Sequence, residues 1–558
     1  MAGRLRWLLR FGWAPLAGAC AAAPGPPVEA DAGAAPARSA PARTSAPGSS
    51  GGAQPAAGAA TAGIVGARVF VLAEPRADAP EIGVLRLGSV VRLREAPPRP
   101  GPGCEGEYRA VAPAGWVCVS PRTATLDPEH DLVLAARRAY PTDFDRDAPF
   151  AWGESVGAPL YRKLPDAAEQ RRAEPDLARH LARAAQLRDA LTRGDDAEVQ
   201  RLTARLGGVA VERASETPPP WLQGGAVAPL AALLAPDDPR ARDGSVPRRS
   251  SVAWIAELWA GDRTWLVTPE LYVVPADRIV RQPPSSFAGV RLAGGVQLPL
   301  AFVRAERADA LHLTGELAPT AQPVAYRDAA RPSDARDEDR PALVEDARGS
   351  TGRLEPAGSA WPRLAALPLT GRARWQRGER YLETRRDGAW VRERDVTVAT
   401  REAARGLPLA PGERWLDVSI HRGTLVAYQG DTPVFATLVS PGLFGYRRVD
   451  GKPARYTTPT GAFRIEWKHR STTMSPDPER RSYFLAEVPW TQFFHMPFAL
   501  HAAYWHDRFG EPKSGGCVNL SVADARWLFA WTSPAVPAGW HGVRAGGDRG
   551  EGTWVQVR

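Results

Sequence analysis

The 558-residue chain is too long for a single hydrophobic core, so several domains are expected. Its 54 prolines and 53 glycines indicate linkers and many turns, while the 44% hydrophobic content is typical of globular protein. The net charge of +9 suits an anionic partner such as a cell-wall polymer or a membrane surface. Nucleic-acid binding is not indicated, because the sequence has no Lys/Arg block with interleaved aromatic residues.

Residues 1–22 have the pattern of an export signal. Arginines precede a short apolar run, and small residues surround Cys20. The segment ending in Cys20 resembles a bacterial lipobox, although Ala17 stands where a lipobox usually has Leu. Lipidation at Cys20 would anchor the protein to a membrane, and cleavage near an A-x-A site with loss of Cys20 is the alternative. We therefore expect an exported, periplasmic protein.

A tether and a first folded unit follow the signal. Residues 23–62 are almost wholly Ala, Pro, Gly, Ser and Thr, which cannot bury enough apolar surface to fold. Between 63 and 126, short β-rich runs alternate with Gly, Pro and Asp turns. This unit resembles a bacterial SH3-like module, a family whose members often dock to the cell wall.

Cys104 and Cys118 lie on either side of one predicted hairpin in this unit. In an exported protein a disulfide is favoured over a metal site, because two thiols do not complete zinc coordination. Such a bridge would stabilise the unit by about 3 kcal/mol in the chain-entropy model. Two separate structural thiols are the alternative.

The middle of the chain divides into two regions. Residues 127–245 are rich in Ala, Leu, Arg and Glu, which favours helices, and Pro175 is expected to separate a short helix from a longer one. From 246 to 400 β signals return, and we expect further SH3-like units there. The acidic tract 331–352 is expected to be an exposed, disordered loop.

The last domain is expected at 410–558. Three runs at 415–420, 424–429 and 432–440 alternate apolar and polar residues and predict a β-meander, and 522–534 predicts a helix. The expected fold class is therefore mainly β: a C-terminal β-sandwich or meander, small SH3-like β-barrels and a helical segment.

Cys517 and His501 are the candidate catalytic residues of this domain. Cys517 follows two glycines, and His501 lies sixteen positions upstream. A cysteine at its ordinary pKa is mostly a thiol near neutral pH, so a nearby histidine that takes its proton would activate it as a nucleophile. The backbone N–H groups of Gly516 and Cys517 could bind the oxyanion that develops during acyl transfer.

The segments TPTGAFRI, HAAYWHDRFG and SGGCVNLS together resemble the L,D-transpeptidase (YkuD) catalytic domain. Ser514, Gly516, Cys517 and Asn519 match that family's cysteine motif, and His501 lies at the right distance before it. The resemblance implies an enzyme without a cofactor that attacks peptidoglycan stem peptides at their third, diamino-acid residue. It also implies that the carbonyl of Ala502 orients His501.

Gly515 departs from the family pattern, since most relatives have His at this place. The departure leaves open a weakened or inactive enzyme. His506 and Tyr504 are further candidates for contact with substrate, and a structural hydrogen bond is the alternative for His506. A zinc site is not indicated, because paired ligand spacings are missing.

Two functions remain after this reading. The first is a peptidoglycan L,D-transpeptidase that forms a cysteinyl acyl-enzyme and transfers it to an amine. The second is an inactive wall-binding lipoprotein, and an L,D-carboxypeptidase would use the same acyl-enzyme with water as acceptor. The sequence does not indicate the acceptor or the oligomeric state.

Overall fold

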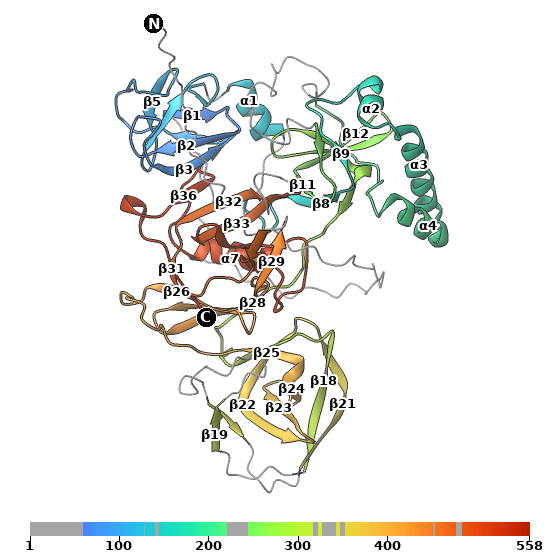
Figure 1. Cartoon of the computed structure of the whole chain (residues 1–558), viewed down its shortest axis with the longest axis vertical. Helices are drawn as coiled ribbons and strands as arrows, with labels where there is room; N and C mark the ends of the chain where they lie inside the picture. Colours follow the sequence, from blue (N-terminus) through green and yellow to red (C-terminus); the bar gives the residue numbers. More distant parts are fainter. Residues whose placement is uncertain are drawn as a thin grey trace.

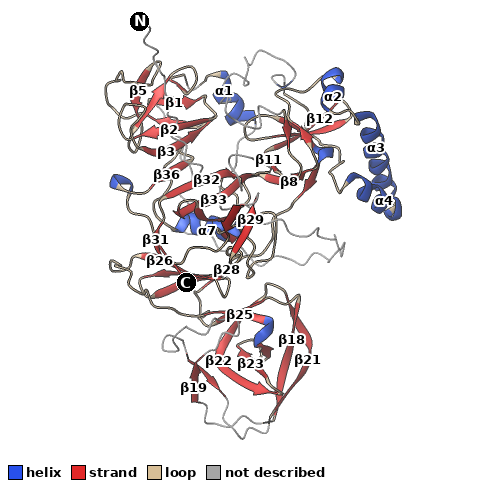
Figure 2. Cartoon of the chain, in the orientation of Figure 1, coloured by secondary structure: helices blue, strands red, loops and turns tan. Residues whose placement is uncertain are grey.

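The computed structural model describes residues 60–127, 129–139, 144–219, 222, 244–315, 322–325, 342–345, 352–449, 452–475 and 483–558. The expected export signal, Cys20 and nearly all of the expected tether lie outside these residues. Strands dominate the described chain, and helices are few (Figure 2). The prediction of a mainly β protein is confirmed.

The first unit (blue in Figure 1) contains seven short strands. They are β1 (Thr61–Ile64), β2 (Arg68–Leu72), β3 (Glu81–Arg86), β4 (Val90–Arg92), β5 (Glu107–Ala110), β6 (Trp116–Val119) and β7 (Ala124–Thr125). One sheet has the order β4-β1-β7, and the other has β3-β2-β6-β5. Neither closes into the expected barrel, and the SH3-like character of the unit stays a prediction. Cys104 and Cys118 form a disulfide with their Cα atoms 5.6 Å apart.

The first unit shares a sheet with the last domain. The nine-stranded order is β35-β34-β33-β32-β36-β3-β2-β6-β5. The strands from the last domain are β32 (Trp467–Met474), β33 (Leu485–His495), β34 (Phe498–Ala502), β35 (Val518–Leu520) and β36 (Gly542–Arg544). Val84 of β3 pairs with Gly542 of β36, so the edge of β3 finds its hydrogen-bond partners in the last domain. The first unit is therefore an extension of that domain.

A second sheet of the last domain has the order β16-β28-β27-β26-β37-β31. Its strands are β16 (Val290–Arg291), β26 (Arg414–Ser419), β27 (Thr424–Gln429), β28 (Thr432–Leu438), β31 (Gly461–Arg464) and β37 (Trp554–Val557). The three predicted runs correspond to β26, β27 and β28. A small hairpin, β29 (Tyr446–Val449) and β30 (Lys452–Arg455), follows them.

The predicted helix is α7 (Val522–Trp531), which packs against β33 and β34. Ser521 caps its N-terminus by accepting a hydrogen bond from the Asp524 N–H. At the other end the buried Lys468 Nζ donates to the carbonyl oxygens of Phe529 and Thr532, at 2.6 and 2.8 Å. These bonds satisfy terminal carbonyl groups of a helix that lies in the core of the last domain.

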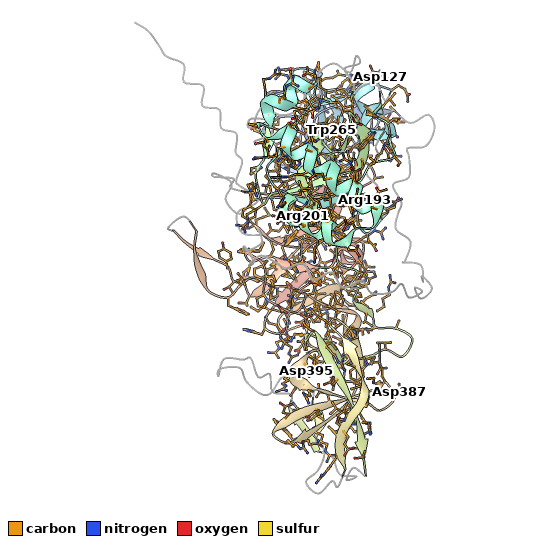
Figure 3. The ribbon with its side chains drawn as sticks, turned by 90° about the vertical axis from the view of Figure 1, so that its right-hand side faces the viewer. Asp127, Arg193, Arg201, Trp265, Asp387 and Asp395 are labelled. Atoms are coloured by element: carbon orange, nitrogen blue, oxygen red, sulfur yellow. A yellow bond between two sulfur atoms is a disulfide. The ribbon has the colours of Figure 1, made fainter. Side chains whose placement is uncertain are left out.

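The helical region and a small β unit lie together beside the shared sheet (Figure 1). The helices are α1 (Asp131–Leu134), α2 (Ala167–Ala173), α3 (Leu177–Arg193) and α4 (Asp196–Leu206), and Pro175 separates α2 from α3 as predicted. Figure 3 shows Arg193 and Arg201 on the outer side of α3 and α4. The strands are β8 (Ala151–Ser155), β9 (Ala158–Pro159), β10 (Ser245–Val246), β11 (Ser251–Trp254), β12 (Ala256–Ala260), β13 (Arg263–Val267), β14 (Val273–Pro275) and β15 (Ile279–Arg281).

The remaining β unit (yellow-green in Figure 1) projects from the opposite end of the molecule. Its strands are β17 (Leu300–Val303), β18 (Arg307–Thr314), β19 (Gln322–Ala325), β20 (Ala342–Glu345), β21 (Arg353–Pro362), β22 (Ala366–Gln376), β23 (Glu379–Thr384), β24 (Trp390–Arg392) and β25 (Val396–Ala399). The expectation that 331–352 is one exposed loop was wrong for 342–345, because β20 pairs with β19 and β22. The rest of that tract, except Gly352, lies outside the described residues. No helix in the described part of the chain has the length and apolarity needed to cross a membrane.

We expect Arg86→Ala to lower the thermal unfolding midpoint markedly. Arg86 Nη2 lies 3.2 Å from Glu270 Oε1 and 3.1 Å from Glu487 Oε1, and both carboxylates are buried. Without the guanidinium, two buried carboxylates each lose a positively charged partner, at a cost of about 3–5 kcal/mol. Arg307→Ala is the control, because its pair with Asp309 is exposed and such pairs contribute about 0–1 kcal/mol. Equal midpoints for both variants in calorimetry would contradict this assignment.

Candidate active site

Two neighbouring parallel strands carry the candidate nucleophile and base. His501 of β34 is paired in register with Asn519 of β35, and Cys517 directly precedes β35. Paired residues of neighbouring strands share a face of the sheet, and alternate residues of an extended chain point to the same side. Cys517, Asn519 and His501 therefore lie on one face. The side chains of His501 and Cys517 are both fully buried. The structure thus brings the two predicted catalytic residues together at one edge of the nine-stranded sheet.

The imidazole of His501 is oriented by the backbone. Its Nδ1 lies 3.0 Å from the carbonyl oxygen of Ala502, so Nδ1 carries the proton and Nε2 keeps its lone pair. Nε2 is buried and has no hydrogen-bond partner among the described residues. Burial lowers the pKa of His501 to about 4, and the bond to Ala502 only partly opposes this effect. His501 is therefore neutral near pH 7 and can accept a proton at Nε2.

Hydrogen bonds also define the surroundings of the sulfur atom. The Ala499 N–H donates to Cys517 Sγ at 3.2 Å. Ser514 Oγ accepts from the Gly516 N–H at 3.0 Å and donates to the Cys517 carbonyl. The Gly516 amide is thus already bonded within its own turn, which differs from its expected role as an oxyanion donor.

Two glycines allow the turn before Cys517 to pack closely. Gly516 has φ +131°, and a Cβ atom there would lie 2.4 Å from Phe498 Cε1. A Cβ atom on Gly442 would lie 2.7 Å from Gly516 Cα and 2.0 Å from the Tyr456 carbonyl oxygen. Any side chain at either position would force the backbone apart. The segment before the β29–β30 hairpin therefore lies directly against the cysteine turn.

Tyr504 is part of the packing around the site, which differs from its expected contact with substrate. Its ring is 1% exposed and stacks on Trp152 with centroids 4.5 Å apart. Its hydroxyl donates to the Ala486 carbonyl at 2.9 Å and also bonds Ser251. The hydroxyl group of Tyr504 is therefore buried and already hydrogen-bonded within the protein.

Asn519 and His506 contact each other beside the candidate catalytic residues. Asn519 Nδ2 lies 3.0 Å from His506 Nε2. The backbone of Asn519 exchanges two 2.9 Å hydrogen bonds with Ser440, which fixes its position. Gly515 is buried in the same turn and contributes no side chain.

Sequence reasoning did not identify several residues that shape the site: Trp152, Ser251, Ser440, Gly442 and Ala499. Trp152, Ser251, Ser440 and Gly442 contact it from distant parts of the chain, and Ala499 lies two residues before His501 on β34. No local motif marks these residues. In the described ranges no group of three or more His, Cys, Asp or Glu side chains could hold a metal ion.

The last domain matches a known family. Residues 413–557 fit the model of the L,D-transpeptidase catalytic domain, YkuD, and this span is such a domain. A comparison with curated proteins gave no match. The predicted resemblance of this part of the chain is therefore confirmed at the level of the family.

Solved structures of L,D-transpeptidases are similar to part of the chain. The enzyme from Xylanimonas cellulosilytica is 22% identical, with a TM-score of 0.21, over 28% of this chain and 64% of that one. L,D-transpeptidase 3 from Mycobacterium tuberculosis is 20% identical, with a TM-score of 0.19, over 30% and 73%. LdtMt1 in complex with imipenem is 22% identical, with a TM-score of 0.20, over 30% and 72%. With scores this low, the family model alone carries the assignment.

We expect Gly516→Ala to abolish labelling of Cys517 by a thiol reagent or to unfold the domain. The new methyl group would overlap the Phe498 ring, and the residue would be strained at φ +131°. Gly546→Ala is the matched control, because Gly546 has φ +107° with nothing near its Cβ position. Equal labelling and thermal midpoints for the two variants would show that the contact with Phe498 does not constrain the turn.

Acid should destabilise the protein below about pH 6.5. Burial lowers the pKa of His501 to about 4 and of His506 and His469 to about 3, so the unfolded chain binds more protons than the folded one as pH falls below about 6.5. Each histidine then removes roughly 1.4 kcal/mol of unfolding free energy by pH 5.5. Asp524, whose pKa burial raises to about 6, acts in the opposite direction.

Urea unfolding at pH 7.5 and 5.5 tests this pH dependence. The His501→Gln variant serves as the comparison, because it removes one group that is buried in its neutral form. Its stability should fall less between the two pH values than that of the parent chain. An equal fall would show that His501 titrates normally in the folded state.

Proposed function

We propose that the protein is a peptidoglycan L,D-transpeptidase in which Cys517 is the nucleophile and His501 the base. The proposal rests on one observation: an L,D-transpeptidase catalytic domain spans 413–557, and inside it Cys517 directly precedes the strand that pairs with the strand of His501, whose Nε2 is buried and unprotonated. The same pair on an unrelated fold would be weaker support, because buried histidines are often structural.

In the first half of the reaction, Cys517 in its thiol form transfers its proton to His501 Nε2 as Sγ attacks the carbonyl carbon of the third stem residue. The bond from that carbon to the nitrogen of the fourth residue breaks. The leaving amine takes the proton from His501, and a thioester remains on Cys517. The Ala502 carbonyl stabilises the transient imidazolium through Nδ1.

In the second half an amine acceptor attacks the thioester carbonyl carbon, and the bond from that carbon to Sγ breaks. His501 accepts a proton from the amine and returns it to the departing sulfur of Cys517. Transfer to a second stem peptide would produce a 3–3 crosslink. Transfer to water would make the protein an L,D-carboxypeptidase, and both reactions use the same acyl-enzyme. We propose an amine as the acceptor, with water as the alternative.

The proposed setting is the periplasm, with the chain exported and held at a membrane by a lipid on Cys20. Peptidoglycan stem peptides are the proposed partners. The first unit, joined to the catalytic sheet through β3 and β36, would then be a fixed part of the surface that faces the wall. This setting accords with the excess of basic residues, since the wall polymer carries carboxylates.

Cys517→Ala tests the proposed function most directly. The parent chain, mildly reduced, should acquire a peptide acyl group on Cys517 from a stem tetrapeptide and an adduct from imipenem, the compound bound to the similar LdtMt1. Mass spectrometry of proteolytic peptides would locate both. The variant should acquire neither and lose at least about 1,000-fold in activity, because no other nucleophile replaces the thiol.

Cys104→Ala/Cys118→Ala is the control for nonspecific effects of cysteine replacement, since this disulfide lies in the first unit. It should still be acylated at Cys517. A parent chain that releases crosslinked product while Cys517→Ala does the same would rule out the proposed function.

A further inference from the structure

Buried polar atoms without partners gather around the candidate site. Among the described residues, His501 Nε2, Trp505 Nε1, His506 Nδ1 and Asn519 Oδ1 make no hydrogen bond. The rings are adjacent: His501 lies 5.9 Å from Trp505, and Trp505 lies 6.2 Å from His506, between centroids. Buried groups of this kind are rare and call for an explanation, which a ligand can provide. His501 Nε2 is the base, and His506 Nδ1 has no role in the mechanism above.

Asn519 determines which nitrogen of His506 carries the proton. The Asn519 Nδ2 group can only donate, so His506 Nε2, 3.0 Å away, must be the acceptor. The proton of the neutral ring is then on Nδ1. Two hydrogen bonds to Ser440 fix the backbone of Asn519, and its side chain is fully buried.

Burial and nearby positive charge keep the His506 ring neutral. Burial is the main cause that lowers its pKa, to about 3, and the nearby Lys513, His501 and Arg363 lower it further. No carboxylate among the described residues contributes to stabilising an imidazolium there. His506 therefore presents a neutral N–H group over the whole range near pH 7.

The site needs such a donor. An acyl-transfer reaction requires hydrogen-bond donors for the carbonyl oxygens of its substrate. One expected donor, the Gly516 N–H, is bonded to Ser514 Oγ at 3.0 Å. Asn519, which contacts His506, lies two residues after Cys517, a spacing of about 7 Å in an extended chain, so His506 lies near the nucleophile.

We infer that His506 is a substrate-binding residue: Asn519 fixes its Nδ1–H tautomer, and that N–H donates a hydrogen bond to a carbonyl oxygen of the acyl-donor peptide. This inference rests on the proposed function for the identity of the peptide. Asn519 acts through His506 and is a positioning residue.

Binding of a synthetic stem tetrapeptide to full-length Cys517→Ala chains tests the inference without turnover. His506→Phe keeps a flat ring but removes the donor, and His506→Gln keeps an N–H donor. Calorimetry should show about tenfold weaker binding for His506→Phe and a change within about threefold for His506→Gln. Equal binding by all three chains would overturn the inference.

Asn519→Asp provides a readout that a merely structural role would not move. Its carboxylate would accept a hydrogen bond from His506 Nε2–H, which moves the proton of the neutral ring to Nε2 and raises the pKa of His506. Binding should then be weak at pH 8 and recover as pH falls, because the imidazolium again has an Nδ1–H. Asn519→Ala should show no such recovery, and neither should the parent, whose binding stays flat. If the Asn519→Asp chain binds the tetrapeptide equally at all pH values, the proposed role of Asn519 is overturned.

The two proposals fail separately. A parent chain that forms no acyl-enzyme with the tetrapeptide would overturn the proposed function. A parent chain that is acylated, while His506→Phe binds the peptide as tightly as His506→Gln, would overturn only the role of His506. Failure of the tetrapeptide to bind any Cys517→Ala chain would overturn both.

Discussion

The position of His501, the proposed catalytic base, depends on how Tyr504 is held. Tyr504 follows β34 by two residues, stacks on Trp152 of β8, and bonds Ser251 of β11 and Ala486 of β33. Three strands from two parts of the chain therefore fix one ring. Since His501 precedes Tyr504 and Trp505 and His506 follow it, that ring sets the path of the whole segment. A buried tyrosine with both hydroxyl partners in place is well suited to this, because moving it would leave polar groups unsatisfied.

The same principle joins the first unit to the catalytic domain. β3 would be an exposed edge if β36 did not pair with it, and Trp540, just before β36, is buried and donates to the Ala112 carbonyl at 2.9 Å. Arg86 adds charge pairing to Glu270 and Glu487 where three parts of the chain meet. A single sheet thus runs from the disulfide-containing hairpin to the strand after Cys517. Movement of the first unit relative to the site would require breaking this sheet.

Local patterns predicted the elements well and their partners poorly. Alternation identified β26 to β28, and Pro175 marked the break between α2 and α3, because these features depend on neighbouring residues. The motif around Cys517 located the site for the same reason. The pairing of β3 with β36 could not be predicted. It joins only two pairs of residues, which lie more than 450 positions apart in the sequence, so no local pattern marks it. Tyr504 was misread for a related reason: its partners Trp152 and Ser251 are distant in sequence. The bond between Gly516 and Ser514 depends on the turn's geometry, which the motif alone does not specify.

The electrostatics of the site favour proton transfer during attack over a preformed ion pair. An imidazolium at His501 is costly, since burial lowers its pKa to about 4, whereas an ordinary thiol has a pKa of about 8.5. Among the described residues only the Ala502 carbonyl opposes this cost, and no carboxylate contributes. Charge separation therefore becomes favourable when the sulfur bonds carbon and the negative charge moves to the substrate oxygen. Neutral donors are what such a charge needs, and the Ala499 N–H serves the sulfur before that step. A neutral His506 at this site would serve the oxygen without adding a second buried positive charge beside His501.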